Sequence, residues 1–422
     1  MTTKKKLHFA WLVLIGLCIT VGLGKAGLNN TAGLFISPVA HDLGVGVGNL
    51  TLYLSISAII TMIFLPIGGR ILGKYDARIV LIVAILLQAG AYALFGFMNS
   101  VWGWYVLAIP LAVGGVFITV LAGPVMVERW FKKRNGMALG IMTAVGGLLG
   151  VLAQPVAGNL IANLGWRHSY TILGVAVIII VIPTILFLIR NNPKDKGLAP
   201  YGIDAAQSDE KHGMDLMQGI AFKDASKSAA FILLALFLFI VTSVASFAIH
   251  IPTYLVNLGY DVKFAGNAMA ALSVGVFVGS LTFGYLTDRS GAKMTAVIAM
   301  IIGFIGVSLL LLFASSTAMI ITGLILFGFV STSIGTVGPA MTSALFGSLE
   351  YSQIFSTASL GLAVASIIAL PAYGYVFDFL GSYIPAMITI LVLLVLNIFF
   401  VLLAFANKEK LVKSGKWQQQ SK

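Results

Sequence analysis

The chain has 422 residues, of which 59% are hydrophobic and only 9% are charged. A soluble globular protein cannot bury that much apolar surface, so the composition excludes a soluble fold and indicates an integral membrane protein. The formal net charge is +12, but the basic residues gather at the termini and on alternate connecting segments, which argues against a nucleic-acid partner.

Apolar stretches follow one another along the chain, each long enough to cross about 30 Å of lipid hydrocarbon as a tilted helix. Twelve are predicted, at residues 9–38, 48–72, 79–99, 103–128, 136–163, 169–190, 228–257, 264–287, 293–314, 318–345, 351–377 and 381–406. We therefore predict an all-α membrane fold with a six-helix bundle over 1–190, a linker over 191–227, a second six-helix bundle over 228–406 and a tail over 407–422.

The distribution of basic residues predicts the orientation of these helices. Of the 26 Lys and Arg, 23 fall at the termini or on alternate loops, whereas Arg167 and Lys263 fall on the opposite side and Lys25 lies inside a stretch. Cytoplasmic loops carry the excess of basic residues, so both termini and the linker are predicted to be cytoplasmic in a multi-pass protein of the cell membrane. The first apolar run is too long for a cleavable signal peptide.

Lys25 lies near the middle of the first predicted helix, where an ammonium costs about 3 kcal/mol to insert. A lysine at this depth should face protein or a water-filled path, where it can hold an anion. Asn29 lies on the same helical face with Asn30 beside it, and amide donors next to an ammonium suit a carboxylate. In the alternative interpretation, Lys25 pairs with backbone carbonyls and Asn29 binds a neighbouring helix.

The predicted seventh helix carries a stripe of residues at three-to-four spacing, which includes His250 and Tyr254. This stripe would face the central path. His250 can donate to an anion or titrate there, although a lone histidine is more often a structural hydrogen-bonding residue. Tyr254 can supply a hydroxyl or mark the membrane interface.

Six residues on other predicted helices are weaker candidates for lining the path, because each is more often a packing residue: Tyr53, Phe117, Thr119, Ser280, Ser331 and Phe355.

All 14 acidic residues fall in loops, tails or at helix ends. With no carboxylate inside a span, coupling to protons would have to use Lys25 or His250, whereas obligatory anion exchange needs no proton site. The sequence also lacks a P-loop, metal-spaced Cys and His residues, and a nucleophile with a base. We therefore expect no enzymatic activity, no cofactor and no metal.

The two halves of the chain repeat. Leu43-Gly44 matches Leu258-Gly259 and the segment 69–74 matches 284–289, both at an offset of 215, while Leu164-Gly165 matches Leu380-Gly381 at 216. Landmarks at nearly one offset indicate a duplicated six-helix unit, and transporters built from repeats bind substrate where the repeats meet.

The segment 284–293, GYLTDRSGAK, resembles the G-x-L-x-D-R-x-G-R-R signature of the major facilitator superfamily. Residues 128–131 and 134–140 resemble the loop between helices four and five of that superfamily. The resemblance implies two pseudo-symmetric bundles of six helices and a cytoplasmic gate that involves Asp288, Arg289, Glu128 and Arg129. Ordinary helix capping is the alternative role for these charges.

Several stretches resemble the oxalate:formate antiporter and monocarboxylate transporter branch of the superfamily, namely residues 146–155, 165–167, 192–202, 250–254, 346–347 and 377–383. In that branch an arginine in helix eight often pairs with the substrate carboxylate, and here Ser280 stands there. The oxalate transporter also uses a lysine in helix eleven, where the region around Ala358 is uncharged. A dianion is therefore disfavoured, and a monoanion held by Lys25 fits better.

The same resemblance places Asn29 and Asn30 where the antiporter contacts its substrate, and Phe355 near an aromatic position of its cavity. We expect a monomeric secondary transporter of a small organic monoanion, such as a lactate-like, short-chain or aromatic acid, working by alternating access. Proton symport and anion exchange both stay open. The first alternative is an exporter of drugs or other metabolites, and the second is a membrane sensor, which a short linker and tail disfavour.

Overall fold

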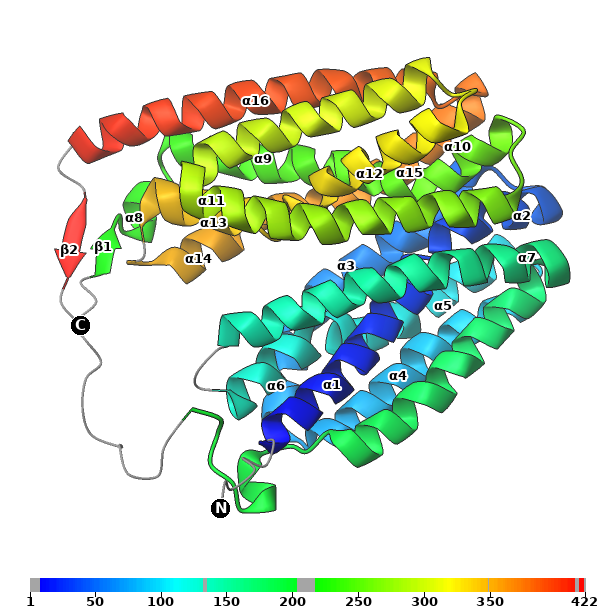
Figure 1. The fold of residues 1–422 in the computed structure, drawn as a ribbon, viewed down its shortest axis with the longest axis horizontal. Coiled ribbons are helices and arrows are strands. Elements are labelled where there is room, and N and C mark those ends of the chain that lie inside the picture. Colours follow the sequence, from blue (N-terminus) through cyan, green and yellow to red (C-terminus); the bar gives the residue numbers. More distant parts are fainter. Residues whose placement is uncertain (1–7, 132–134, 203–216, 348, 414–416, 421–422) are drawn as a thin grey trace, which may run out of the picture. The chain divides into compact units, whose positions relative to one another are not determined.

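The structure is a computed structural model that describes residues 8–131, 135–202, 217–347, 349–413 and 417–420. Parts of the predicted linker and tail, residues 203–216, 414–416 and 421–422, lie outside the described residues, as do residues 1–7. The described residues confirm the all-α membrane fold, since helices make up nearly all of them (Figure 1).

Ten helices in this described part of the chain are long and apolar enough to cross a membrane. Two of them, α7 (Asn135–Leu188) and α11 (Val262–Leu312), each contain one residue outside the helical region, Gly165 at φ 77° and Gly291 at φ 78°. Glycine adopts a positive φ without a steric penalty. Each of these helices joins two of the predicted spans at this kink, so the ten helices supply the twelve spans expected.

Unit 1 is one of two compact units and comprises Met1–Val45, Leu52–Glu210 and Asp261–Ala270. In its core α7 packs against α1 and α4, and α4 packs against α5. Its elements, in chain order, are α1 (Phe9–Gly22), η1 (Leu23–Asn29), α2 (Ala32–Leu43), most of α3 (Val47–Lys74), α4 (Ala77–Leu94), η2 (Phe95–Phe97), α5 (Val101–Gly115), η3 (Val116–Leu121), α6 (Ala122–Trp130), α7, η4 (Pro193–Lys196) and the start of α11.

Unit 2 comprises Gly46–Thr51, Lys211–Tyr260 and Ala271–Lys422, and α9 packs at its centre against α12, α15 and α16. A short antiparallel pair of strands, with Met217 opposite Gln420, adds to the helices. The elements of unit 2 are β1 (Met217–Gly219), α8 (Phe222–Ala225), α9 (Ala229–Ser246), η5 (Phe247–His250), α10 (Ile251–Asn257), most of α11, α12 (Thr317–Thr332), α13 (Val337–Phe346), α14 (Tyr351–Ala358), α15 (Leu360–Leu380), α16 (Ile384–Lys413) and β2 (Gln418–Gln420).

The first turn of α3 belongs to unit 2, where Asp378 caps it. The Asp378 carboxylate accepts hydrogen bonds from the backbone N–H groups of Val47 at 2.8 Å and Gly48 at 2.7 Å. A Cβ on Gly48 would lie 2.5 Å from the Tyr375 ring, so this turn has no room for a side chain. At the offset of 215, Gly46–Thr51 corresponds to the start of Asp261–Ala270, which belongs to unit 1. The bundle boundaries taken from the sequence stay a prediction.

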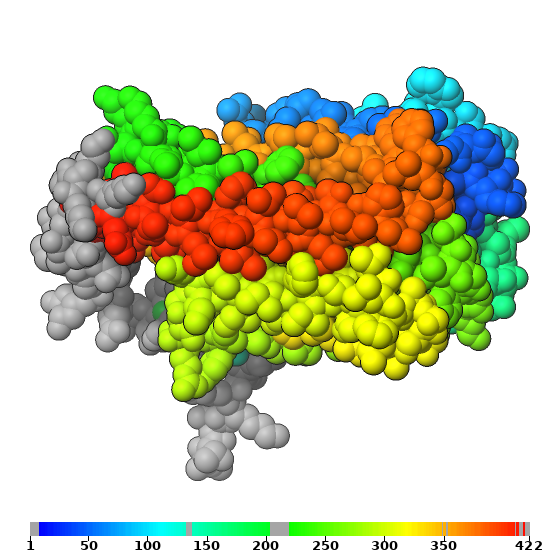
Figure 2. Space-filling view, turned by 90° about the horizontal axis from the view of Figure 1, so that it is seen from above, coloured from blue at the N-terminus to red at the C-terminus, as the bar shows by residue number. Residues whose placement is uncertain are grey.

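An exposed apolar stripe runs along α16, which Figure 2 shows in red on one face of unit 2. Ile388, Val392 and Phe399 recur at helical spacing and are each at least 50% exposed. An apolar surface of this extent would aggregate in water, whereas lipid chains would cover it. The outer face therefore agrees with a membrane-embedded bundle.

Candidate functional site

Lys25 and Asn29 lie in η1, a π-helical segment inside the first span. The backbone N–H of Asn30 donates to the carbonyl of Lys25, five residues earlier, at 2.9 Å, which is the wide turn of a π-helix. A Cβ on Gly24 would lie 2.5 Å from Ile118 Cγ2, so the glycine lets this turn pack closely on η3. Such turns are often found at functional sites, because they redirect side chains.

The wide turn presents Lys25, Asn29 and Asn30 on an exposed face, while Ala26 and Leu28 are buried. Among the residues that the structure describes, none forms a hydrogen bond or ion pair with the Lys25 ammonium. The alternative in which backbone carbonyls satisfy this ammonium therefore has no such contact here. An ammonium without a counter-charge at this depth could attract an anion, and substrate contact by Lys25 stays a prediction.

Two buried glutamines hold η1, and neither is among the site residues predicted from the sequence. Gln88 Nε2 of α4 donates to the Gly24 carbonyl at 3.2 Å and to Asn29 Oδ1 at 3.3 Å. Gln154 Nε2 of α7 donates to the Asn30 carbonyl at 2.7 Å. The signal for both was an amide side chain inside an apolar stretch, which needs a partner in the membrane.

The remaining unit 1 candidates are more enclosed. Phe117 and Thr119 lie in η3, the second π-helical segment, where Phe117 is buried and Thr119 Oγ1 donates to the Gly115 carbonyl at 2.8 Å. Tyr53 of α3 is buried, with its ring 5.5 Å from that of Phe95. Among the substrate-binding candidates of unit 1, the exposed residues are thus Lys25, Asn29 and Asn30.

His250 ends η5, a 3₁₀ segment in the seventh span, and is fully buried. Its Nδ1 lies 3.0 Å from the Tyr383 hydroxyl and its Nε2 lies 2.7 Å from the Leu370 carbonyl, so both ring nitrogens are engaged. The buried Tyr254 hydroxyl donates to the Leu310 carbonyl at 2.6 Å. Substrate contact by these two residues stays a prediction, and here their polar atoms serve the packing of unit 2.

The three weaker candidates of unit 2 lie on different helices and are half-buried. Ser280 Oγ of α11 donates to the Phe277 carbonyl at 2.8 Å. Phe355 of α14 stacks on Tyr351 with ring centroids 5.8 Å apart. Ser331 lies in the last turn of α12. Their part in a binding path stays a prediction.

The fourth helix of each repeat departs from regular α-helical geometry at an equivalent position. The first copy contains η3, and the second breaks into a turn at residues 333–336 between α12 and α13. The offset of 216 found in the sequence carries Phe117 of η3 onto Ser333 of this turn. Interrupted helices are typical of substrate sites in transporters built from repeats, and of these two positions the turn at 333–336 is such an interruption.

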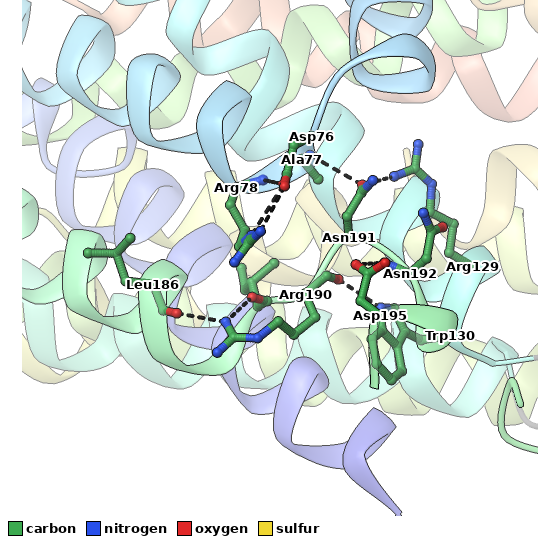
Figure 3. Close-up of polar contacts among 11 residues, drawn as sticks. Asp76, Ala77, Arg78, Arg129, Trp130, Leu186, Arg190, Asn191, Asn192 and Asp195 are labelled. Carbon is green, nitrogen blue, oxygen red and sulfur yellow. Dashed lines mark hydrogen bonds and ion pairs between the residues drawn. The ribbon is translucent and has the colours of Figure 1, made fainter. Parts of the chain in front are cut away.

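Arg129, one of the predicted gate residues, lies in a polar cluster that joins helix ends of unit 1 (Figure 3). Its guanidinium donates to Asn191 Oδ1 at 2.6 Å and to the Leu72 carbonyl at 2.7 Å. The same Asn191 oxygen accepts from the Ala77 backbone N–H at 3.2 Å. Arg129 thereby ties α6 to the end of α3, the start of α4 and the residues after α7.

Asp76 caps α4 in the same cluster, since its carboxylate accepts from the Arg78 backbone N–H at 2.9 Å. A hydrogen bond and ion pair with the Arg78 side chain, also at 2.9 Å, lower the pKa of the Asp76 carboxyl below its usual value.

The other gate candidates, Glu128, Asp288 and Arg289, are exposed, and Arg289 donates to the Tyr285 hydroxyl at 2.9 Å. The gate itself stays a prediction. In the part of the chain that the structure describes, no three His, Cys, Asp or Glu side chains gather as metal ligands would.

The family model described as the Major Facilitator Superfamily matches residues 17–272 and 256–421. Monocarboxylate transporter 12 of Xenopus laevis is 22% identical over 407 residues, which cover 91% of this chain and 87% of that protein. The sialic acid transporter NanX of Escherichia coli (strain K12) is 23% identical over 72% of this chain and 73% of its own length.

A solved structure has the same fold. A bacterial homologue of the human lysosomal transporter Spinster, crystallised in an inward-facing and unoccupied conformation, superposes with a TM-score of 0.71. The match covers 97% of this chain and 98% of that one at 14% sequence identity, so the likeness concerns the fold alone.

Proposed function

The chain belongs to the major facilitator superfamily, and from this premise we propose that it is a secondary transporter of a small organic monoanion. Alternating access between the two six-helix halves would carry the anion across the membrane. Relatives named for monocarboxylates and for sialic acid support an organic acid as the substrate class.

The observation that carries this proposal is Lys25, an exposed residue whose ammonium forms no hydrogen bond or ion pair with the described residues. The site offers one positive charge, with amide donors of Asn29 and Asn30 on the same turn. One carboxylate neutralises the charge of Lys25, whereas a dicarboxylate would bring a second negative charge with no positive charge to neutralise it.

Coupling to protons would use Lys25 in this proposal, because both ring nitrogens of His250 are engaged by neighbours. Exchange of one anion for another is the second form of coupling that fits the site. The proposal also places the protein in the cell membrane as a monomer. Both termini are proposed to be cytoplasmic because of the distribution of basic residues.

A thermal-shift experiment on the purified protein in detergent tests the substrate class. Acetate, lactate and benzoate are compared with oxalate and succinate at pH 7.5, on the native protein, Lys25→Ala and the control Lys263→Ala, which removes an exposed lysine at the start of α11. A ligand at 100 times its Kd stabilises the native state by about 2.7 kcal/mol, so binding raises Tm.

At least one monocarboxylate should raise the Tm of the native protein and of Lys263→Ala, and leave that of Lys25→Ala unchanged. The proposal fails if no monocarboxylate raises Tm, or if Lys25→Ala responds as the native protein does. Uptake of the stabilising acid into proteoliposomes, with and without an inward proton gradient, then separates symport from exchange.

A further inference from the structure

The side-chain amide of Asn29 has an acceptor end and a donor end, and Gln88 engages only one of them. Gln88 Nε2 donates to Asn29 Oδ1 at 3.3 Å, so the acceptor end of Asn29 points to α4. The Nδ2 group with its two N–H donors therefore lies at the opposite edge of the planar amide, away from Gln88, and Asn29 is an exposed residue. Donors next to the Lys25 ammonium favour an anion, whereas a carbonyl oxygen there would repel one.

We propose that Gln88 is a positioning residue that fixes the donor end of Asn29 toward the bound carboxylate. This inference rests on the proposed function. The torsion at the end of an Asn side chain is broad and two-fold, so the amide can turn by about 180° unless a neighbour holds it. Gln88 is that neighbour, and by holding the amide of Asn29 it keeps N–H donors, which favour an anion, facing the site.

The packing around Gln88 keeps the side chain where this role requires it. A Cβ on Gly114 of α5 would lie 2.6 Å from the Gln88 backbone nitrogen and 2.9 Å from Gln88 Cβ, so α5 touches α4 closely at this residue. Gln88 Nε2 also donates to the Gly24 carbonyl at 3.2 Å. Packing thus fixes the backbone and Cβ of Gln88, and hydrogen bonds fix its side-chain amide.

The other end of the Gln88 amide is left without a partner. Gln88 is fully buried, and among the described residues nothing donates to its Oε1. A buried acceptor without a hydrogen bond is unfavourable, and an apolar side chain of the same shape would fill the space without this penalty. A residue that only packed here would not need the amide, whereas the hold on Asn29 does need it.

A double-mutant cycle on anion binding tests the proposal. The affinities of the native protein, Gln88→Met, Asn29→Ala and the double variant are measured by titrating acetate, lactate and benzoate against Tm. Gln88→Met keeps the volume and removes the N–H donor, so it should weaken the affinity of the native protein about fivefold, as expected for one lost hydrogen bond. In the Asn29→Ala background the same change should have no further effect, because Gln88 acts through Asn29.

The control is Asn397→Leu, which removes another buried amide with an unpartnered oxygen, in unit 2. It should lower Tm without changing the anion affinity. A second variant, Gln88→Leu, also removes the N–H donor at similar volume and takes the same place in the cycle if Gln88→Met does not fold.

The outcomes separate this inference from the proposed function. If the native protein binds a monocarboxylate through Lys25 but Gln88→Met binds it equally well, only the positioning role is wrong. It is also wrong if Gln88→Met weakens binding by the same factor with and without the Asn29 side chain. If no monocarboxylate binds the native protein, the proposed function fails first and this inference with it.

Discussion

The contact between α11 and α12 should not tolerate a methyl group at Gly275. A Cβ on Gly275 would lie 2.0 Å from the Ile325 carbonyl oxygen and 2.8 and 2.9 Å from two further backbone atoms of the same residue. Ordinary contact begins at 3.4 Å, so the helices would have to separate locally by about 1.4 Å, the difference between 3.4 and 2.0 Å. Gly275→Ala therefore forces apart two helices of unit 2.

The size of the effect follows from which atoms are in the way. Overpacking a well-packed interior typically costs about 1–3 kcal/mol, and backbone atoms cannot rotate aside as a side chain can. We expect the cost of the clash to lie at the upper end of this range, about 3 kcal/mol. Alanine favours a helix over glycine by about 1 kcal/mol, so Gly275→Ala should lower the free energy of unfolding by about 2 kcal/mol in total. Gly284→Ala is the matched control, because it lies in the same helix and an added Cβ there meets no atom within 4 Å.

The assay is thermal unfolding of the three proteins in one detergent, without added acid. Gly275→Ala should melt below the native protein, and Gly284→Ala at or above it. Equal melting temperatures for the two alanine variants would refute the reasoning that close backbone contact holds these helices together.

Two further predictions concern the polar cluster of unit 1. Asp76→Asn should lower stability by about 1 kcal/mol at pH 7.5, as expected for a weakened cap and lost ion pair. The folded pKa of Asp76 lies below its unfolded value, so this contribution is present above the unfolded pKa of about 3.9 and fades as pH falls through the folded pKa. Thermal unfolding of native protein and variant at pH 7.5 and near pH 3 should show the difference shrink, and a constant difference would contradict it. Arg129→Lys should lower the free energy of unfolding by about 1.5–3 kcal/mol. The compact ammonium of lysine cannot reproduce the forked guanidinium, which donates to Asn191 and to the Leu72 carbonyl at the same time. Arg190→Lys is its control, since among the described residues that guanidinium donates only to carbonyls one and four residues away. If Arg190→Lys lowered Tm as much as Arg129→Lys does, the role given to the Arg129 cluster would be contradicted.

The spans could be predicted from the sequence because insertion in lipid depends on composition and length, both of which are local properties. Runs of about twenty apolar residues marked the helices well, and Gly165 and Gly291 fall between the predicted spans that α7 and α11 join. Lys25 could be identified for the same reason, since a charge in an apolar run is visible without any structure.

The shape of the candidate site could not be predicted, because it depends on contacts between distant residues. The wide turn of η1 packs on Ile118 and is held by Gln88, 64 residues after Gly24. The stripe that includes His250 was read with α-helical periodicity, but η5 is a 3₁₀ segment, in which each residue advances about 20° further than in an α-helix. The ring of His250 consequently lies beside Tyr383 in the interior of unit 2.

The reciprocal placement of Gly46–Thr51 and Asp261–Ala270 bears on how such a chain can originate. In both repeats the start of the second helix is grouped away from the rest of its own repeat, so the two repeats follow one pattern. A repeated unit of this kind could first have worked as two identical copies in a symmetric dimer. Fusion of two genes then converts a concentration-dependent assembly into an intramolecular one. After fusion the two copies are free to diverge, and Lys25 in one copy with an uncharged Ile240 at the offset of 215 in the other is an instance of that divergence.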